Sequence, residues 1–177
     1  MRPVNPNWYT TPDEGTTRFS YDYAGRAIAT QDAVQSGNNQ IAYNLFDNNN
    51  RIIESGQANS TGIWATFRKY SDFISTLSGK AEITLIDYDS PSDVLSGEFP
   101  KGQQNLRNRV AAVRYQYNQG NNTYAAANSY DALGNVVRNV QFYPSLGIIR
   151  AQSIKSIDYV FDKLNGQVMR IVYQQGK

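Results

Sequence analysis

The sequence predicts a mainly β protein built of consecutive antiparallel β-hairpins in a curved sheet, with one short α-helix near residues 63–77. Three observations predict this fold. Tyrosine and glycine, which favour strands and turns, occur 13 times each. A short turn-forming unit recurs four times along the chain. The residues that flank this unit alternate between apolar and polar, as the residues of half-buried strands do.

The recurring unit reads aromatic, aspartate, two variable residues, glycine or asparagine, a polar residue and then aliphatic residues. Its copies lie near residues 21–28, 46–53, 130–137 and 161–168, the last with one extra residue in the turn. The defining residues are Tyr21, Asp22, Gly25 and Arg26; Phe46, Asp47, Asn50 and Arg51; Tyr130, Asp131, Gly134 and Asn135; and Phe161, Asp162 and Gly166.

Each position of the unit has a physical role in a β-hairpin. The aromatic residue ends one strand and is expected to anchor the hairpin by burial. The aspartate accepts hydrogen bonds from backbone N–H groups of the turn. Glycine or asparagine tolerates a positive φ. Apolar stripes flank the turns and are expected to pack inside the protein; they include Phe19, Tyr21 and Tyr23, then Ile157, Tyr159 and Phe161, and then Met169, Ile171 and Tyr173.

Between the second and third copies the pattern changes. Apolar residues at helical spacing predict the helix over 63–77, with Ser60 or Thr61 as its N-cap and Gly79 as its C-terminal stop. Residues 81–88 predict a strand, 90–101 a loop, and 105–118 a long strand or a turn followed by a strand. No linker divides the chain, so we expect a single domain over residues 1–177.

The composition excludes several classes of chemistry. The chain has no cysteine and no histidine, which excludes disulfides and catalysis by Ser-His-Asp or Cys-His groups. The formal net charge of +2 and the spread of the basic residues indicate no nucleic-acid partner. No apolar stretch has the length that a membrane helix needs, so we expect no membrane insertion. We also expect no cofactor and no metal, because turn stabilisation explains the repeat aspartates.

Two further function classes remain open. Asp87 and Asp89, with Asp93 and Glu98 nearby, form the densest carboxylate cluster. On a strand Asp87 and Asp89 would face the same side, as a carboxylate-dependent glycoside hydrolase requires of its acid and base. Trp8 and Trp64 are candidates for stacking on sugar rings, which would make the chain a carbohydrate-binding or adhesion module that binds cell-surface glycans.

The units at 21–26 and 130–135 resemble the YD repeats of the Rhs family. With the stretches 11–19, 104–110 and 157–177, the chain is similar to Rhs-repeat proteins of Bacteroidetes-type bacteria. The resemblance implies hairpin strips that spiral into a hollow shell around a toxic C-terminal domain, as in Rhs toxins and insecticidal toxin complexes, or that belong to adhesion proteins. It implies a partial shell here, acting as a structural scaffold, secreted or at the bacterial cell surface.

The implied partner is the remainder of a larger Rhs-like chain or its effector domain. The chain departs from the family pattern in being too short to close a shell and in lacking the Asp-Pro pair of the self-cleavage segment. We therefore expect no self-cleavage, no enzymatic activity, and a fragment of a larger protein, with a naturally short member as the alternative. Unpaired strand edges predict self-association.

Overall fold

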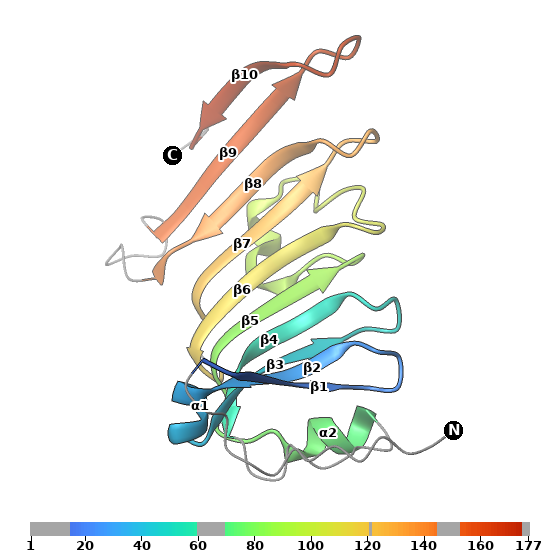
Figure 1. Cartoon of the computed structure of the whole chain (residues 1–177). Coiled ribbons are helices and arrows are strands. Elements are labelled where there is room, and N and C mark those ends of the chain that lie inside the picture. Colours follow the sequence, from blue (N-terminus) through green and yellow to red (C-terminus); the bar gives the residue numbers. More distant parts are fainter. Residues whose placement is uncertain (1–14, 60–69, 121, 145–152, 175–177) are drawn as a thin grey trace. The chain divides into compact units, whose positions relative to one another are not determined.

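The computed structural model describes residues 15–59, 70–120, 122–144 and 153–174. Ten antiparallel strands follow one another in chain order in one open sheet (Figure 1), which confirms the predicted fold class. The chain divides into two compact units, residues 1–83 and 84–177. Each unit is described by itself below, and a single domain over residues 1–177 stays a prediction.

In the first unit, two hairpins form from the first two copies of the repeat. They comprise β1 (Thr17–Tyr21) with β2 (Ala27–Asp32), and β3 (Gln40–Phe46) with β4 (Ile52–Asn59). β5 (Ala81–Tyr88) begins in this unit and has the predicted bounds. The core lies where the helix α2 (Tyr70–Thr76) meets the strands, and it consists of Ile28, Ala29, Ile41, Tyr43, Leu45, Ala58 and Phe73.

The helices differ from the prediction in two respects. The helix predicted over 63–77 is present as α2, while residues 60–69, with the predicted cap, lie outside the described part. A second helix, α1 (Ala33–Gly37), was not predicted. Asp32 and Gln35 form a capping box there, with Asp32 Oδ1 accepting from Gln35 N–H at 2.7 Å and Gln35 Oε1 from Asp32 N–H at 3.1 Å. The Asp-x-x-Gln sequence was the available signal.

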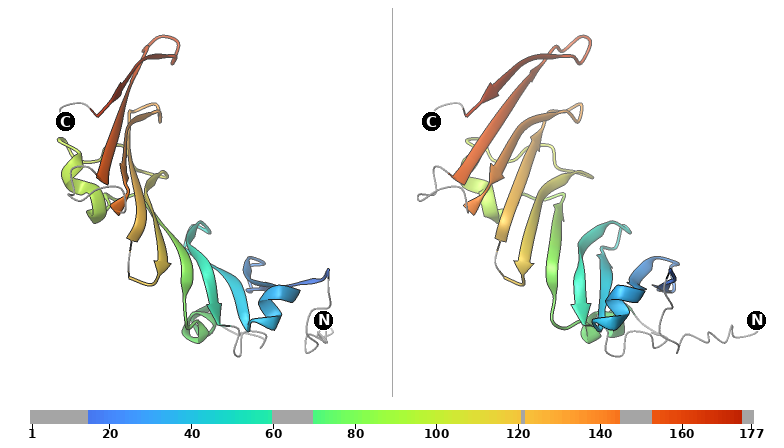
Figure 2. Two further views of the ribbon diagram at one scale, coloured as in Figure 1. Left: turned by 90° about the vertical axis from the view of Figure 1, so that its left-hand side faces the viewer. Right: turned by 60° about the vertical axis from the view of Figure 1, so that its left-hand side comes forward.

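In the second unit, five strands follow β5: β6 (Val110–Asn118), β7 (Asn122–Tyr130), β8 (Val136–Phe142), β9 (Ile154–Phe161) and β10 (Val168–Tyr173). The predicted loop over 90–101 contains a short 3-10 helix, η1 (Asp93–Glu98). Figure 2 shows η1 against one side of these strands. The core beneath η1 consists of Leu95, Phe99, Ala112, Ala125, Ala127, Val140 and Ile154.

Two of the predicted packing stripes are exposed. Tyr21 and Tyr23 on the first stripe are 59% and 74% exposed, and Met169 and Ile171 on β10 are 69% and 60% exposed. Tyr21 lies on the first strand of the sheet order and Tyr23 in the turn that follows it, while Met169 and Ile171 lie on the last strand, so at most one neighbouring strand flanks each residue. The prediction that they pack inside the protein is wrong for this reason.

Candidate functional site

The four repeat turns are the feature that the sequence singles out. The first three have the same backbone hydrogen bonds, and the fourth has one more residue between its bonded groups. They join β1 to β2, β3 to β4, β7 to β8 and β9 to β10. A left-handed residue stands at the predicted place in each turn: Gly25 (φ 76°), Asn50 (φ 63°), Gly134 (φ 100°) and Gly166 (φ 70°). Glycine and asparagine adopt this conformation at the lowest cost, which explains their recurrence.

A β-bulge accompanies every turn and was not predicted. In the first hairpin Ser20 pairs with Ala29 but Tyr21 pairs with Ala27, so Ile28 is the extra residue. The same offset makes Ile53, Val137 and Met169 the extra residues of the other three hairpins. A bulge bends its strand and increases the local twist. The repeat unit therefore encodes a turn and a bend together.

The repeat aspartates close the turns as predicted. Asp22 Oδ1 accepts hydrogen bonds from Ala24 N–H and Arg26 N–H at 2.9 and 3.0 Å. Asp47 Oδ1 accepts from Asn49 N–H and Arg51 N–H at 2.8 and 2.9 Å. In both turns the other carboxylate oxygen, Oδ2, accepts the Nε–H of the arginine four residues later, at 2.6 and 2.8 Å.

The later turns vary this arrangement. Asp131 Oδ1 accepts from three backbone N–H groups, those of Leu133, Gly134 and Asn135, at 2.8–2.9 Å. Asn135 replaces the arginine and donates its Nδ2–H to Asp131 Oδ2 at 2.9 Å. In the fourth turn, Asp162 Oδ1 accepts from Leu164 N–H at 2.7 Å. The aspartate therefore has the same local role with different partners.

These bonds favour the ionised carboxylates. Burial is the largest single effect on Asp22 and Asp47 and raises their pKa values. The hydrogen bonds and charge of Arg26 and Arg51, with the N–H groups of Ala24 and Asn49, together outweigh it, so both pKa values lie below the ordinary value of 3.8. The pKa of Asp131 is lowered chiefly by the hydrogen bond from the Asn135 side chain, against a smaller opposing effect of burial.

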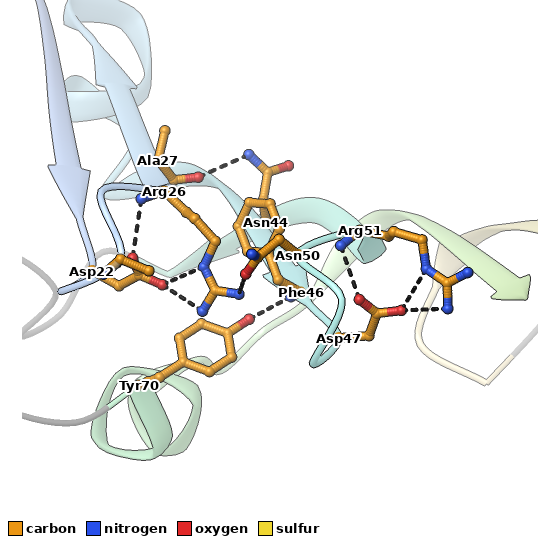
Figure 3. Close-up of polar contacts among 10 residues, drawn as sticks. Asp22, Arg26, Ala27, Asn44, Phe46, Asp47, Asn50, Arg51 and Tyr70 are labelled. Carbon is orange, nitrogen blue, oxygen red and sulfur yellow. Dashed lines mark hydrogen bonds and ion pairs between the residues drawn. The ribbon is translucent and has the colours of Figure 1, made fainter. Parts of the chain in front are cut away.

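Arg26 joins the first turn to the second (Figure 3). Its Nη2 lies 2.6 Å from Asp22 Oδ2, and its Nη1 donates to Asn50 Oδ1 in the next turn at 2.9 Å. The guanidinium carbon lies 4.8 Å from the ring centroid of Phe46 and 5.1 Å from that of Tyr70 on α2. The hydroxyl oxygen of Tyr70 in turn accepts a hydrogen bond from the Phe46 backbone N–H at 2.5 Å. The two hairpins and the helix thus meet around one cation.

The third turn has a cation from a different part of the chain. Arg109 lies with its guanidinium carbon 5.5 Å from the Tyr130 ring centroid, and its Nη1 donates to the Asn105 carbonyl at 2.6 Å. A Cβ at Gly134 would lie 2.8 Å from Arg109 Nη2. A cation over a repeat aromatic residue is therefore found in both compact units, although the third copy of the repeat has Asn135 in place of the arginine.

The predicted burial of the repeat aromatics is confirmed for some copies only. Tyr130 is 9% exposed and packs with Leu106 and Ala111. Phe46 and Phe161 are half-buried, and Phe46 packs against the core of its unit. Tyr21 is 59% exposed, so its predicted role as a buried anchor is wrong. It lies at the end of the first strand in the sheet order, where only one neighbouring strand flanks it.

A buried glutamine that the sequence did not single out closes the loop before β6. Gln103 Oε1 accepts from Ser92 N–H at 2.8 Å, and its Nε2 donates to the Ala111 and Asn128 carbonyls, both at 2.7 Å. The side chain is 7% exposed and supplies the hydrogen bonds that a neighbouring strand would otherwise give to these three backbone groups. No local pattern marks such a residue, because its partners are up to 25 positions away.

The carboxylate cluster does not take the predicted arrangement. β5 ends at Tyr88, and Asp89 has a left-handed φ of 66°, so the predicted strand alternation stops before it. Asp87 forms an ion pair with Arg114 at 2.6 Å, whereas Asp89 Oδ1 accepts from Asn108 N–H at 2.6 Å. The expectation that Asp87 and Asp89 share a strand face is wrong, since only Asp87 lies on the strand.

The described ranges hold neither a cluster of metal ligands nor a membrane-spanning helix. Within residues 15–59, 70–120, 122–144 and 153–174, no group of three acidic side chains is placed to hold a metal ion. None of the helices in these ranges has the length and apolar character needed to cross a membrane. The two candidates for sugar stacking, Trp8 and Trp64, lie outside the described residues.

Comparison with known proteins places the fold. No protein-family model matches the sequence, and no curated protein matches it. Among solved structures, the chain is similar to that of the Photorhabdus luminescens Tc holotoxin pore, with a TM-score of 0.50 and 14% sequence identity. The match covers 88% of this chain and 6% of that chain. The likeness shows the fold, in agreement with the hairpin strip that the YD-repeat resemblance implies.

Proposed function

We propose that the chain is a structural segment of the wall of a larger YD-repeat β-shell, secreted or displayed at a bacterial surface, and that it is not an enzyme. The observation that carries this proposal is the recurrence of one turn-and-bulge unit in an ordered, open antiparallel sheet. Each unit adds two strands and one bend of the same kind. Repetition of such a unit builds a wall, as stacking does in other repeat proteins.

The contacts that the two arginines make at the repeat turns support a structural role. Arg26 ties the first turn to the second through Asn50 and Phe46, so neighbouring hairpins hold a fixed relation. Arg109 takes a similar place over Tyr130 in the third turn. These cations are bound by carbonyl, carboxylate and ring groups of the chain itself. That is the arrangement expected of a scaffold, whose polar groups stabilise its own backbone.

The last strand supports the proposal that the sheet belongs to a larger one. β10 ends the sheet order, and Met169, Ile171 and Tyr173 on it are 59–69% exposed. An apolar edge strand of this kind is suited to receive a further strand. The likeness to a small part of the Tc holotoxin pore, which covers 6% of that chain, agrees with this arrangement.

The experiment is detection of the native protein in its source cells and culture medium, with two antibodies against separate epitopes of this chain. The chain has a mass of 19.9 kDa. A band far above this mass in both blots, with tryptic peptides outside this sequence after immunoprecipitation, supports the wall segment and identifies the attached effector. A single band near 19.9 kDa, with no further peptides, contradicts it.

A second measurement addresses self-association of the isolated chain. Light scattering coupled to size-exclusion chromatography reports its molar mass in solution. An exposed edge strand predicts a mass above that of one copy, and replacing Ile171 by lysine on β10 is expected to restore the monomer. The matched control is Val34→Lys, because Val34 is 73% exposed and lies on α1 rather than on an edge strand.

A further inference from the structure

The loop between β5 and β6 covers one face of the sheet in the second unit. Leu95 of η1 and Phe99, which follows it, belong to one buried cluster with Val140 of β8. Figure 2 shows η1 on this side of the strands. Arg138 stands two residues before Val140 and therefore lies on the same face, and so does its direct pairing partner Asp158 on β9.

A hollow of about 380 Å³ lies where this loop meets the strands, and it is called here the strap hollow. The loop contributes Phe99, Pro100 and Lys101 to its lining. The strands contribute Val137, Arg138 and Asp158. The volume is within the range of small-ligand sites, roughly 300–1,000 Å³.

Arg138 is held in place through two of its three guanidinium nitrogens. Its Nε–H donates to the Glu98 carbonyl at 3.1 Å, and its Nη1 donates to both carboxylate oxygens of Asp158 at 2.7 Å. Among the described residues, none accepts a hydrogen bond from Nη2, and this nitrogen is not buried. An Nη nitrogen carries two N–H groups. Arg138 therefore offers an oriented pair of donors to a ligand in the strap hollow.

The lining of the strap hollow carries one uncompensated positive charge. Its charged residues are Lys101, Arg138 and Asp158. Arg138 and Asp158 form an ion pair, so their charges largely cancel. Lys101 is exposed and has no hydrogen bond or ion pair with any other residue that the structure describes. Lys101 and the free nitrogen of Arg138 are thus both available to an anion.

Apolar surface lies beside these two cationic groups. Phe99 is 5% exposed, and Pro100 and the half-buried Val137 extend its apolar surface along the lining. A carboxylate accepts charge-assisted hydrogen bonds from guanidinium and ammonium groups. The charge of Asp158 disfavours a second negative charge nearby. The lining is therefore complementary to a monoanion with an apolar body, rather than to a doubly charged phosphate.

We propose that the strap hollow binds a small organic acid. Its single carboxylate lies between Nη2 of Arg138 and Nζ of Lys101, and its apolar body lies against Pro100 and Val137. Asp158 is a positioning residue, because it holds the guanidinium in the orientation that leaves Nη2 free. The site lies within the second unit and does not depend on whether the chain is part of a larger wall.

The test is a titration of the isotope-labelled full chain with phenylpropionate, followed by the backbone amide chemical shifts in heteronuclear NMR spectra. Phenylpropanamide has the same apolar body without the charge, and acetate has the carboxylate without the apolar body. The variant is Lys101→Gln, which removes the charge at an exposed position. The matched control is Lys163→Gln, because Lys163 is exposed in the fourth repeat turn and does not line the strap hollow. Thermal melting establishes that both variants fold.

We expect phenylpropionate to shift the amide signals of Lys101, Arg138 and their neighbours in a saturable manner. Lys101→Gln should weaken this binding by about threefold, the effect of losing one exposed ion pair, whereas Lys163→Gln should leave it unchanged. The proposal is overturned if phenylpropionate gives no saturable shift, or if the shifted signals lie away from the strap hollow. It is also overturned if phenylpropanamide or acetate binds as tightly as phenylpropionate, or if the two lysine variants bind alike.

Discussion

Substitution of Arg26 by lysine tests whether one guanidinium group holds the first two repeat turns together. Lysine keeps the positive charge near Asp22 but presents a single ammonium group, so it cannot contact Asp22 and Asn50 from a planar fork. In the structure, Arg26 reaches Asp22 through Nε and Nη2 and Asn50 through Nη1, while its plane lies over the rings of Phe46 and Tyr70.

The expected loss follows from the contacts that lysine cannot make. The hydrogen bond to the neutral Asn50 oxygen is worth about 1 kcal/mol. Part of the stacking over the two rings, worth roughly 0.5–1 kcal/mol at a half-exposed site, is also lost. We therefore expect Arg26→Lys to lower the free energy of unfolding by about 1.5 kcal/mol. The Asp22 carboxylate keeps its bonds from Ala24 N–H and from the backbone N–H of residue 26, so the turn itself survives.

The assay is urea denaturation followed by far-UV circular dichroism, with Arg107→Lys as the control because Arg107 is exposed. A double-mutant cycle with Asn50→Gly isolates the bond across the turns, since glycine keeps the positive φ of Asn50 while removing the acceptor. The coupling should be about 0.5–1 kcal/mol, above the additivity error of independent sites. If the two changes add without coupling, or if Arg26→Lys costs no more than Arg107→Lys, the reasoning about a shared cation is refuted.

Three other changes have clear expected outcomes. Gln103→Met should destabilise the chain by about 2–4 kcal/mol, because it leaves three buried backbone groups unpaired, whereas Gln104→Met at the exposed neighbouring position should be close to neutral; equal urea midpoints would contradict this. Gly134→Ala should lower the melting temperature more than Gly25→Ala, since both glycines have a positive φ but only at Gly134 would the new Cβ lie against Arg109. Gly134→Val should lower the melting temperature more than Gly134→Asn. Equal melting temperatures of the valine and asparagine variants would contradict the turn assignment. The free energy of unfolding should fall as the pH drops below about 5. The repeat aspartates Asp22, Asp47 and Asp131 have folded pKa values below their unfolded value of 3.8. The stabilisation that this difference supplies is fully present above the unfolded pKa and is lost as the pH falls through the folded pKa. A triple aspartate-to-asparagine variant should show a flatter acid branch in the same titration, and an unchanged slope would show that other groups cause it.

The sequence by itself determined the repeat turns. Asp22 bonds to residues two and four positions later, and Gly25 supplies the left-handed residue between them, so every partner is present within five residues. A local set of this kind forms in the same way wherever the unit stands. The strand over 81–88 was predicted for a similar reason, because its pattern of residues is complete within its own length.

Only the tertiary structure decided which of these residues are buried and which arginine side chains contact them. Tyr21 and Tyr130 stand at the same place in the unit, yet one is 59% and the other 9% exposed, because Leu106 and Arg109 cover Tyr130 from a distant loop. Arg26 depends on Asn50 and Tyr70, and Gln103 on Ser92, Ala111 and Asn128, which lie 8 to 44 positions away. The hydrogen bond from Asn139 to Asn128 likewise forms only once strand register has placed the two residues side by side. Burial and partner choice are set by packing between segments far apart in the chain, and no pattern within a single segment records them.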